Sequence, residues 1–551
     1  MLKNITPNKK RWASVLAVSL ATVSLVACDP GLPFAPNPSG PAKAGAPGAP
    51  VYTMIFDAGS SGTRISFFKV IPGAYPKIEL LASEDFDDNG INDFLNSQGT
   101  VDPDDWKKAG TTLPAGYKPV GCDMTVTSVN GGQKDVGPCV IQPLLDAMDK
   151  KMKEISVTAD QVTVELFATA GMRTMDKVNG GAYDATQIAG FYNAIKDYTK
   201  SKGYQVGSFE TSNGNKQEGV WTWVNLNDQY YNAFGGNDTY HKTAPETRGD
   251  FEVGGSSMQI AFPTNMPAND ADNVYTVSIN GHTYNVFSKT YLGLGGDDTR
   301  KYVRASGYNT STAADYTGLD CFGSNATPTN SKEDSGVALF NSPALFPSGQ
   351  TPAGNATGTT WAPVLSNAEQ PLMLKSAGKY NFNSCATKYD QVTKAVMALP
   401  RNNNGTNNEG TPSSYKDLVA KVEKSTAPFV GLDGFYFSAK DLKLVNADPK
   451  PPVLKTPITE AQVKEAIAKV CPDNGAGPAA KKAPGRINDF RVCADSVYMY
   501  NFLWQGTAAN ALGLFGSSNN AKFDGVVPSK WEGKTTLTWT RGYLLLKHAT
   551  K

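Results

Sequence analysis

Histidine is scarce in this chain of 551 residues, which contains only three: His241, His282 and His548. None has a metal-ligand or triad partner at a characteristic spacing in the sequence, which argues against zinc centres and histidine-based hydrolysis. A basic excess is also missing, because the formal net charge is +1. The chain therefore has little charge with which to neutralise a nucleic-acid backbone, and we expect no nucleic-acid partner.

The apolar run near the N-terminus is too short for an ordinary membrane-spanning helix. It covers residues 12–27 and follows a start with four basic residues, which is typical of an export signal. Its end, Leu25–Cys28, resembles a bacterial lipoprotein cleavage box, in which Cys28 becomes the lipidated first residue. We therefore expect an exported lipoprotein of the cell envelope, a monomer held to the membrane by its lipid. The alternative is cleavage at a small-residue site, which would give a soluble product.

Cysteine is sparse as well, and its number is informative. Of the seven cysteines, six remain when Cys28 is set aside, and an even number in an exported chain predicts disulfides. Many pairings are possible, but the six fall into three couples that are local in sequence, and short loops close at the least entropic cost. We predict the pairs Cys122–Cys139, Cys321–Cys385 and Cys471–Cys493.

The length of the chain predicts two domains or lobes rather than one core. Residues 28–50 are rich in Pro, Gly and Ala and read as a tether. From Val51 onward, short apolar runs alternate with helix-like stretches at 142–154, 188–202 and 459–470, which favours an α/β architecture. The expected organisation is a signal peptide at 1–27, the tether at 28–50, a first lobe at 51–214 plus 517–551, and a second lobe at 215–516.

An internal repeat is the most informative pattern. The segment from Asp57 to Phe67 reads DAGSSGTRISF, and the segment from Glu252 to Phe262 reads EVGGSSMQIAF. An acid, Gly, Ser, Ile and Phe fall in register. Each copy follows an extended run, has small residues at the bend and continues into another strand-like run. The pattern predicts two similar hairpin loops in two related lobes.

Such loops have the parts of a phosphate cradle. A carboxylate at the end of a strand, followed by Gly and Ser, offers backbone N–H groups, hydroxyl donors and an acid that can hold a cation. One loop alone is as often a plain turn, and the repeat favours the functional interpretation. We expect Asp57 and Glu252 to hold Mg²⁺ or Ca²⁺ through water, because Mg²⁺ dehydrates reluctantly. The string Gly533–Thr535 imitates the end of a P-loop, but Pro528 stands where its first Gly is required.

With these motifs the chain resembles the ecto-apyrases, the nucleoside triphosphate diphosphohydrolases, which carry five ordered motifs. The matching segments are Asp57–Arg64, Ala168–Arg173, Gln217–Trp223 followed by Asn227, Glu252–Gln259 and, more loosely, Cys493–Leu503. A further family signature resembles Tyr291–Gly295 with Arg300, and the closing segment resembles Leu537–Leu544.

The resemblance implies a two-lobed, actin-like (ribonuclease H-like) α/β fold with the active site in the cleft between the lobes. It implies hydrolysis of nucleoside tri- and diphosphates, including ATP and ADP, to the monophosphate and phosphate. Glu218 would be the general base, and Ser257 and Gln259 would position the water. The phosphate-binding residues it implies are Ser60, Ser61, Gly62, Thr63, Arg64, Thr169, Arg173, Gly254, Gly255 and Ser256. For Arg173, a purely structural pairing with Asp57 or Glu252 is the alternative.

Two departures from the family pattern affect binding. Glu252 stands where the family usually has Asp, which lengthens a cation-binding side chain by one methylene. The stacking ring expected just beyond Phe437-Ser438 is missing, and Tyr436, Tyr498 and Tyr500 are the alternatives for stacking a nucleobase. An aromatic ring in such a segment is more often part of the core.

Three rival functions remain at this point. A phosphotransferase of the sugar- or acetate-kinase type shares the loops, but the export signal speaks against a supply of ATP. A polyphosphate or guanosine-tetraphosphate phosphatase fits the Glu218 motif and the cysteine couples less well. A nucleotide-binding sensor without catalysis is the third, and a Glu218→Gln variant separates binding from turnover.

Overall fold

The computed structural model describes residues 48–550, except 61, 87–89, 96–98, 102–111, 115–116, 123–128, 180, 237–245, 307–319, 323–379, 398, 400–401, 403–414, 446–457, 472–489, 506–512, 516–521, 529 and 532–534. All described residues belong to one compact unit, Ser39–Lys551, which is distinct from Met1–Pro38. The predicted signal peptide, Cys28 and nearly all of the tether lie outside the described residues.

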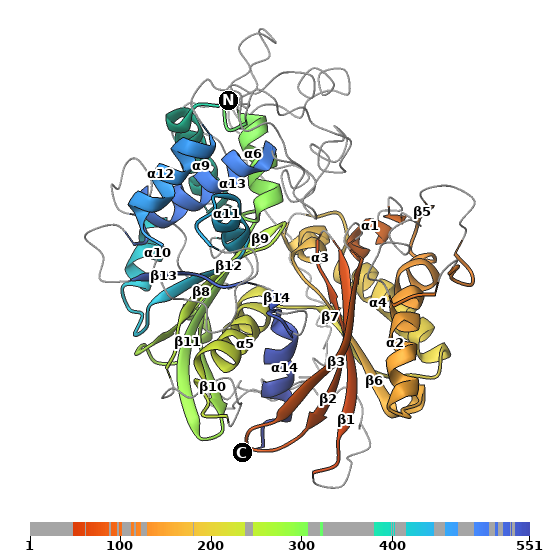
Figure 1. The fold of residues 1–551 in the computed structure, drawn as a ribbon. Helices are drawn as coiled ribbons and strands as arrows, with labels where there is room; N and C mark the ends of the chain where they lie inside the picture. Colours follow the sequence, from red (N-terminus) through yellow and green to blue (C-terminus); the bar gives the residue numbers. More distant parts are fainter. Residues whose placement is uncertain are drawn as a thin grey trace, which may run out of the picture. The chain divides into compact units, whose positions relative to one another are not determined.

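A five-stranded sheet carries the first copy of the repeat (Figure 1). Its order is β3-β2-β1-β6-β7, in which β1 and β2 and then β2 and β3 pair antiparallel, whereas β1, β6 and β7 run parallel. The strands are β1 (Val51–Ala58), β2 (Thr63–Ile71), β3 (Lys77–Phe86), β6 (Val162–Ala168) and β7 (Gln205–Thr211). Residues 53–58 of the central strand β1 are all buried, which explains its nearly continuous apolar run.

A six-stranded sheet carries the second copy, with the order β10-β11-β9-β8-β12-β13. The strands are β8 (Gly249–Val253), β9 (Ser257–Thr264), β10 (Val274–Ile279), β11 (His282–Leu292), β12 (Phe429–Asp433) and β13 (Phe523–Val526). The β8 strand pairs antiparallel with β9 and parallel with β12, as β1 does with β2 and β6. The two sheets therefore share one strand plan, which confirms the predicted two-lobed α/β fold.

Helices flank both sheets (Figure 1). They are α1 (Ile91–Leu95), α2 (Gln142–Glu154), α3 (Ala170–Met175), α4 (Ala185–Ser201), α5 (Val220–Tyr231), α6 (Gly296–Ser306), α9 (Phe382–Met397), α10 (Tyr415–Val422), α11 (Gly434–Asp441), α12 (Glu460–Val470), α13 (Phe490–Tyr500) and α14 (Trp539–His548). Two two-stranded antiparallel sheets are formed by β4 (Gly99–Val101) with β5 (Val129–Gly131), and by β14 (Lys530–Trp531) with β15 (Thr535–Thr536). The helices predicted at 142–154, 188–202 and 459–470 correspond to α2, α4 and α12. Capping boxes begin α4 at Asp184 and α12 at Thr459, as such sequences favour.

The helices α5 and α14 pack against each other, although more than 300 residues separate them in the chain. Gly542 allows their close approach, since a Cβ there would lie 1.9 Å from the carbonyl oxygen of Trp221. Beside this contact the rings of Phe167, Trp221, Trp539 and Tyr543 form one aromatic cluster. The C-terminal helix is therefore fixed against the first sheet and α5 together.

Part of the C-terminal segment lies elsewhere than predicted. We assigned residues 517–551 to the first lobe, but β13 pairs with β12 in the second sheet. Phe523 and Val526 are buried there against the second-lobe core, so their apolar side chains explain the pairing. Helix α14 does contact β2 and β3 of the first sheet. The remaining lobe boundaries stay predictions.

All three predicted disulfides are present in the structure. They join Cys122 to Cys139, Cys321 to Cys385, and Cys471 to Cys493. The last pair ties the end of α12 to the second turn of α13. The local pairing argument from the sequence is therefore confirmed.

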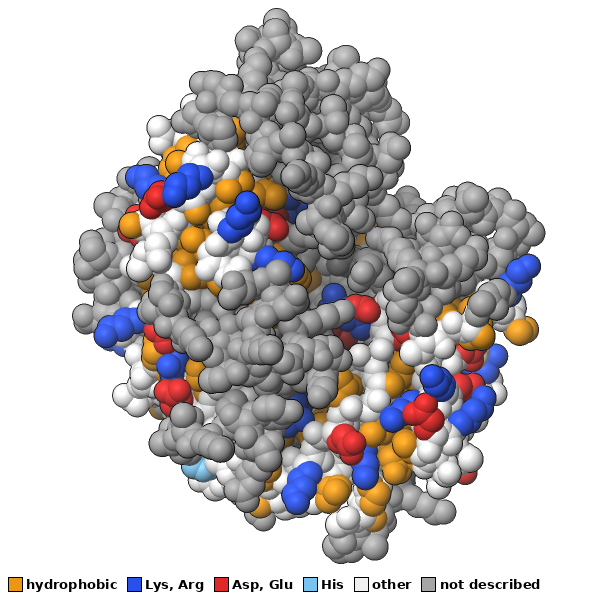
Figure 2. All heavy atoms as spheres, in the orientation of Figure 1, with side chains coloured by type: hydrophobic (Ala, Val, Ile, Leu, Met, Phe, Trp, Pro, Cys, Tyr) orange, Lys and Arg blue, Asp and Glu red, His pale blue; other side chains and the backbone are white. Residues whose placement is uncertain are grey.

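Charges of both signs are mixed on the surface. On the face drawn in Figure 2, described Lys and Arg side chains are interspersed with Asp and Glu. Among the helices that the structure describes, none combines the length and the apolar character that crossing a bilayer requires.

Candidate active site

The first loop follows β1, and the pairing of Ala58 with Thr63 closes it over residues 59–62. The loop packs closely against Gly171 of α3. A Cβ on Gly171 would lie 2.8 Å from the Ser60 Cα atom. The backbone N–H of Thr169 donates to the carbonyl of Ala58 at 3.0 Å. The second motif is thus held directly against the first loop. Of the predicted phosphate-binding residues here, Ser61 lies outside the described residues.

The second loop follows β8 and is supported by the first residues of α6. The N–H groups of Gly296 and Asp297 donate to the carbonyls of Gly254 and Gly255 at 2.8 and 3.0 Å. A Cβ on Gly295 would lie 2.2 Å from the Gly255 carbonyl oxygen, so no larger residue fits there. This contact gives the signature at 291–295 a physical reason.

The two loops touch at Gly255. A Cβ at this position would lie 2.7 Å from Ser60 Oγ of the first loop and 2.9 Å from Asp297 Oδ2. The structure therefore brings together the two copies of the repeat, far apart in sequence.

Asp57 is the residue before the last of β1, and it is buried. Trp539 Nε1 of α14 donates to its Oδ1 at 3.1 Å, and an Arg64 nitrogen lies 4.0 Å from its Oδ2. Burial raises the pKa of Asp57 to about 6; the nearby Glu218 and Asp433 add to the rise, and Arg64 opposes it. The negative charge of Asp57 is therefore only partly offset by Arg64 and Trp539.

Glu252 lies near the end of β8, and its Oε2 accepts a hydrogen bond from Thr222 Oγ1 at 3.0 Å. Burial raises its pKa well above the ordinary value, and the charges of Glu218, Asp433 and Asp250 raise it further. Negatively charged side chains from β1, β8, β12 and the turn before α5 are therefore close enough to one another to raise the pKa values of Asp57 and Glu252. Carboxylate oxygens are the ligand type that Mg²⁺ and Ca²⁺ prefer.

Asp433 was not identified from the sequence. It ends β12 next to β8, where Leu432 pairs with Glu252 and Asp433 with Val253. The sequence did contain a sign of this residue, because Asp433 lies at the end of an apolar run and Gly434 follows it. In both repeated loops a Gly also follows the acid, two positions on. Its backbone φ of +47° and ψ of −107° is one that residues other than Gly rarely adopt.

Glu218 lies on a π-helical turn, Gly214–Gly219, directly before α5. Asn213 begins this turn, and its side-chain oxygen accepts from two backbone N–H groups. Glu218 is buried, and its Oε2 accepts from Arg173 Nη1 at 2.6 Å. The carboxylate that pairs with Arg173 is therefore Glu218, whereas the structural alternative named Asp57 or Glu252.

Ser257 and Gln259 lie on the same face of β9, two residues apart, and both are buried. Gln259 Nε2 donates to Ser257 Oγ at 2.8 Å, and Arg173 Nη2 approaches the same oxygen at 3.4 Å. The predicted base and the two predicted water-positioning residues thus form one hydrogen-bonded group through Arg173.

Comparison with known proteins now identifies the family. Residues 134–549 match the model of the GDA1/CD39 (nucleoside phosphatase) family, a range that covers most of the chain. The chain belongs to this family.

Two relatives illustrate what this chain is similar to. Ectonucleoside triphosphate diphosphohydrolase 2 of Gallus gallus is 21% identical over 421 residues, 75% of this chain and 71% of the relative. The Homo sapiens protein of the same name is 24% identical over 266 residues, 48% of this chain. That match spans 46% of the human protein, about half its length. Family membership makes the chain a hydrolase of nucleoside phosphates.

The nucleoside phosphatase fold also recurs in a crystal structure of nucleoside triphosphate hydrolases from Neospora caninum. The TM-score is 0.53 at 14% identity, covering 91% of this chain and 93% of that one. This likeness establishes the shared fold.

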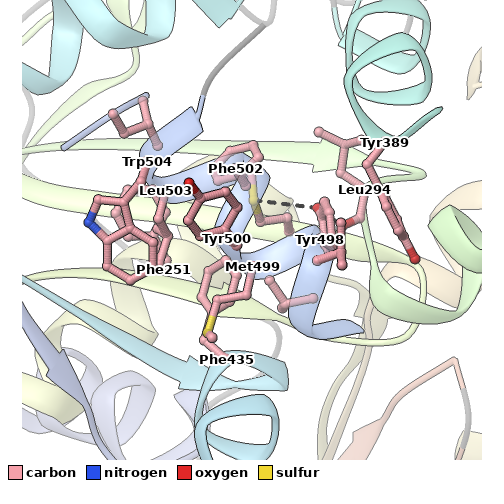
Figure 3. Close-up of a cluster of buried hydrophobic side chains, with 14 of the residues drawn as sticks. Phe251, Leu294, Tyr389, Phe435, Tyr498, Met499, Tyr500, Phe502, Leu503 and Trp504 are labelled. Carbon is pink, nitrogen blue, oxygen red and sulfur yellow. Dashed lines mark hydrogen bonds between the residues drawn. The ribbon is translucent and has the colours of Figure 1, made fainter. Parts of the chain in front are cut away.

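The three tyrosines predicted to stack a nucleobase are buried in the core of the second lobe: Tyr436, Tyr498 and Tyr500 are at most 5% exposed. Tyr498 stacks on Tyr389 (Figure 3). Its hydroxyl donates to the carbonyl of Leu294. Tyr500 packs against Trp504. The prediction was wrong because apolar periodicity does not distinguish a binding ring from a core ring. Phe437, beside Tyr436, is only partly buried.

In the described part of the chain, no three His, Cys, Asp or Glu side chains converge closely enough to hold a metal ion directly. The prediction that Asp57 and Glu252 act through water stays a prediction.

Proposed function

We propose that this nucleoside phosphatase is an apyrase, which hydrolyses nucleoside tri- and diphosphates to the monophosphate and inorganic phosphate. The observation that carries the proposal is the burial of Glu218, bonded to Arg173 and adjacent to Ser257, beside the carboxylates of Asp57 and Glu252. Metal-assisted phosphoryl transfer to water needs a base, acids that bind a cation and loops that bind phosphate, and these groups lie together here.

In the proposed reaction Glu218 takes a proton from the attacking water, which Ser257 and Gln259 position. The water oxygen forms a bond to the terminal phosphorus, and the bond to the bridging oxygen breaks. Its electron pair leaves with the nucleoside di- or monophosphate. Positioning and charge stabilisation dominate such reactions, because the phosphoryl group requires little covalent help from the protein.

The two loops are proposed to bind the phosphates. Their backbone N–H groups, with the hydroxyls of Ser60, Ser61 and Thr63 and the side chain of Arg64, would donate to the phosphate oxygens. Thr169, Gly62 and the loop Gly254–Ser256 complete the proposed cradle. The contact between the loops at Gly255 supports this assignment.

The family requires a divalent cation, and we propose that Asp57 and Glu252 hold Mg²⁺ or Ca²⁺ through water, with Asp433 adjacent. When bound, the cation supplies positive charge to the phosphate oxygens in the transition state. The raised pKa values of Asp57 and Glu252 support this role, since a cation would relieve the cost of ionising both.

We further propose that the protein is an exported lipoprotein, cleaved before Cys28 and acting as a monomer at the cell envelope. The three disulfides support an oxidising compartment. Incorporation of labelled fatty acid into the wild-type chain but not into Cys28→Ala tests this proposal. Labelling of both chains, or of neither, would contradict it.

The catalytic proposal is tested by phosphate release from ATP and ADP by Glu218→Gln. Glu84→Gln is a matched control, because Glu84 is similarly buried but lies on β3, where it bonds Thr112. We expect Glu218→Gln to lose activity by about 10²-fold or more, the scale of general-base catalysis, and the control to retain it. Equal activities of the two variants would refute Glu218 as the base.

A further inference from the structure

The side chain of Arg173 makes contacts that a phosphate clamp would not need. We propose that Arg173 is a positioning residue, which holds Glu218 by one carboxylate oxygen and Ser257 by its hydroxyl, and that it does not bind the substrate phosphates. This inference rests on the proposed role of Glu218 as the base.

The first observation is how Arg173 is anchored. It lies on α3 and is buried, and its Nη1 donates to the carbonyl of Ser212 at 3.1 Å and to Ser212 Oγ at 3.3 Å. Ser212 directly follows β7 and is itself fixed, since its N–H and hydroxyl both donate to the carbonyl of Ala168. The guanidinium is thus fixed to the edge of the first sheet before any substrate binds.

The second observation is the geometry at Glu218. Arg173 Nη1 bonds Oε2 at 2.6 Å, a short charge-assisted contact. Among the described residues, Oε2 is the only side-chain oxygen of Glu218 with a recorded protein hydrogen bond. One oxygen is therefore held, and the other is oriented by the same contact to receive a proton from water.

The third observation concerns Ser257. A hydroxyl has one donor hydrogen and two acceptor positions. Both acceptor positions are approached by N–H groups, from Gln259 Nε2 at 2.8 Å and Arg173 Nη2 at 3.4 Å. The hydroxyl hydrogen of Ser257 is therefore the group left to bond the oxygen of the attacking water. Arg173 thus orients both groups that would bind the attacking water, the carboxylate of Glu218 and the hydroxyl of Ser257.

A clamp on phosphate would use the paired N–H groups of the guanidinium for the anion. In Arg173 the Nη1 donors are committed to Glu218 and Ser212, so the pair formed by Nη1 and Nη2 is not free for an anion. On the other edge, Nη2 approaches Ser257 Oγ, and Nε is buried without a hydrogen-bond partner among the described residues. Arg64 differs, because its side chain is 47% exposed beside the first loop. It provides a matched comparison for a residue that would bind phosphate.

The test combines turnover with substrate affinity. Arg173→Gln, Glu218→Gln, the double variant and Arg64→Gln are compared by kcat and KM for ATP. Affinity for a non-hydrolysable β,γ-imido triphosphate with Mg²⁺ is measured by calorimetry. We expect Arg173→Gln to lower kcat by about 10²-fold, the scale of a misplaced catalytic group, with the analogue Kd changed less than about threefold. Arg64→Gln should weaken the analogue instead.

The double variant separates the two roles further. If Arg173 acts through Glu218, its loss adds little once Glu218 is Gln, because residues that act as a unit are not additive. Arg173→Lys, which keeps the charge but loses the fork, should give the same pattern if the Gln variant folds poorly. An additive loss in the double variant, or a loss of analogue affinity as large as the loss of kcat, would overturn the inference. Full activity of Glu218→Gln would contradict the proposed function itself.

Discussion

Gly255 is the residue at which the two loops meet, and a side chain there would have to displace two neighbours. Because a Cβ there would lie 2.7 Å from Ser60 Oγ and 2.9 Å from Asp297 Oδ2, we predict that Gly255→Ala displaces these two side chains. The expected result is a fall in ATP hydrolysis of about 10²-fold, since displacement of reacting groups by about 1 Å has effects of that size.

Gly190 is the control for this substitution. It lies in α4, and a Cβ there would meet nothing within 4 Å. Gly190→Ala should leave phosphate release unchanged and raise the free energy of unfolding by up to about 1 kcal/mol, because Ala favours helix. If Gly255→Ala kept wild-type activity, contact between the loops would have no catalytic meaning.

Asp250 provides a prediction about pH. It is fully buried on β8, and burial raises its pKa well above the ordinary value of 3.8. The folded state therefore keeps a proton that the unfolded chain releases above about pH 4. This stabilising contribution is complete below the unfolded pKa and is lost as the pH rises towards the folded pKa.

Asp250→Asn removes this titration while keeping the size of the side chain. We predict that the difference in melting temperature, variant minus wild type, increases from pH 5 to pH 8. Asp270→Asn is the control, because Asp270 is exposed and its ion pair with Lys216 lies at the surface. A difference that does not change with pH would show that Asp250 does not titrate in this range.

Single residues also mark the limit of prediction from sequence. Asp57 and Glu252 were recognisable because the repeated loops are local patterns. Asp433 was missed because its meaning depends on the pairing of β12 with β8, a contact between distant segments. Tyr498 was misassigned because the sequence does not show that its ring stacks on Tyr389.

At the scale of elements, the packing of α14 on α5 links the C-terminus to the site. Gly542→Ala would place a Cβ 1.9 Å from the Trp221 carbonyl, so the helices must separate. We predict a loss of about 1–3 kcal/mol in the free energy of unfolding, as for other overpacked contacts, measured by urea denaturation. Activity should fall too, because α14 carries Trp539, which bonds Asp57. A more stable variant would contradict this account.

The disulfides should differ in their contributions. Cys321–Cys385 closes 64 residues, whereas Cys122–Cys139 closes 17. Loop-closure entropy predicts about 4 kcal/mol for the longer loop and about 3 kcal/mol for the shorter one. Replacing each pair by Ser and measuring thermal unfolding without reductant should rank the variants in that order. The reverse ranking would show that local packing outweighs loop length.

Elements were predicted with uneven success for a physical reason. Helices α2, α4 and α12 have strong periodicity, and the last two begin with capping boxes, so local sequence defines them. Strand β13 has only four residues, and its place beside β12 follows from burial in a distant core. Local sequence patterns therefore predicted the helices and the loops, but they did not predict the pairing of β13 with β12.

The molecule as a whole combines two sheets of one strand plan, so that the repeated loops meet and the acids of both lie together. This arrangement gives a central claim that can be tested without any variant: the protein is a cation-dependent hydrolase of nucleoside tri- and diphosphates. The most direct measurement is phosphate release by the full chain from ATP, ADP, AMP and pyrophosphate, with Mg²⁺, Ca²⁺ or EDTA. We predict release from ATP and ADP with a divalent cation, none from AMP, and loss of all activity in EDTA. Absence of release from every nucleotide, or equal release in EDTA, would contradict the account.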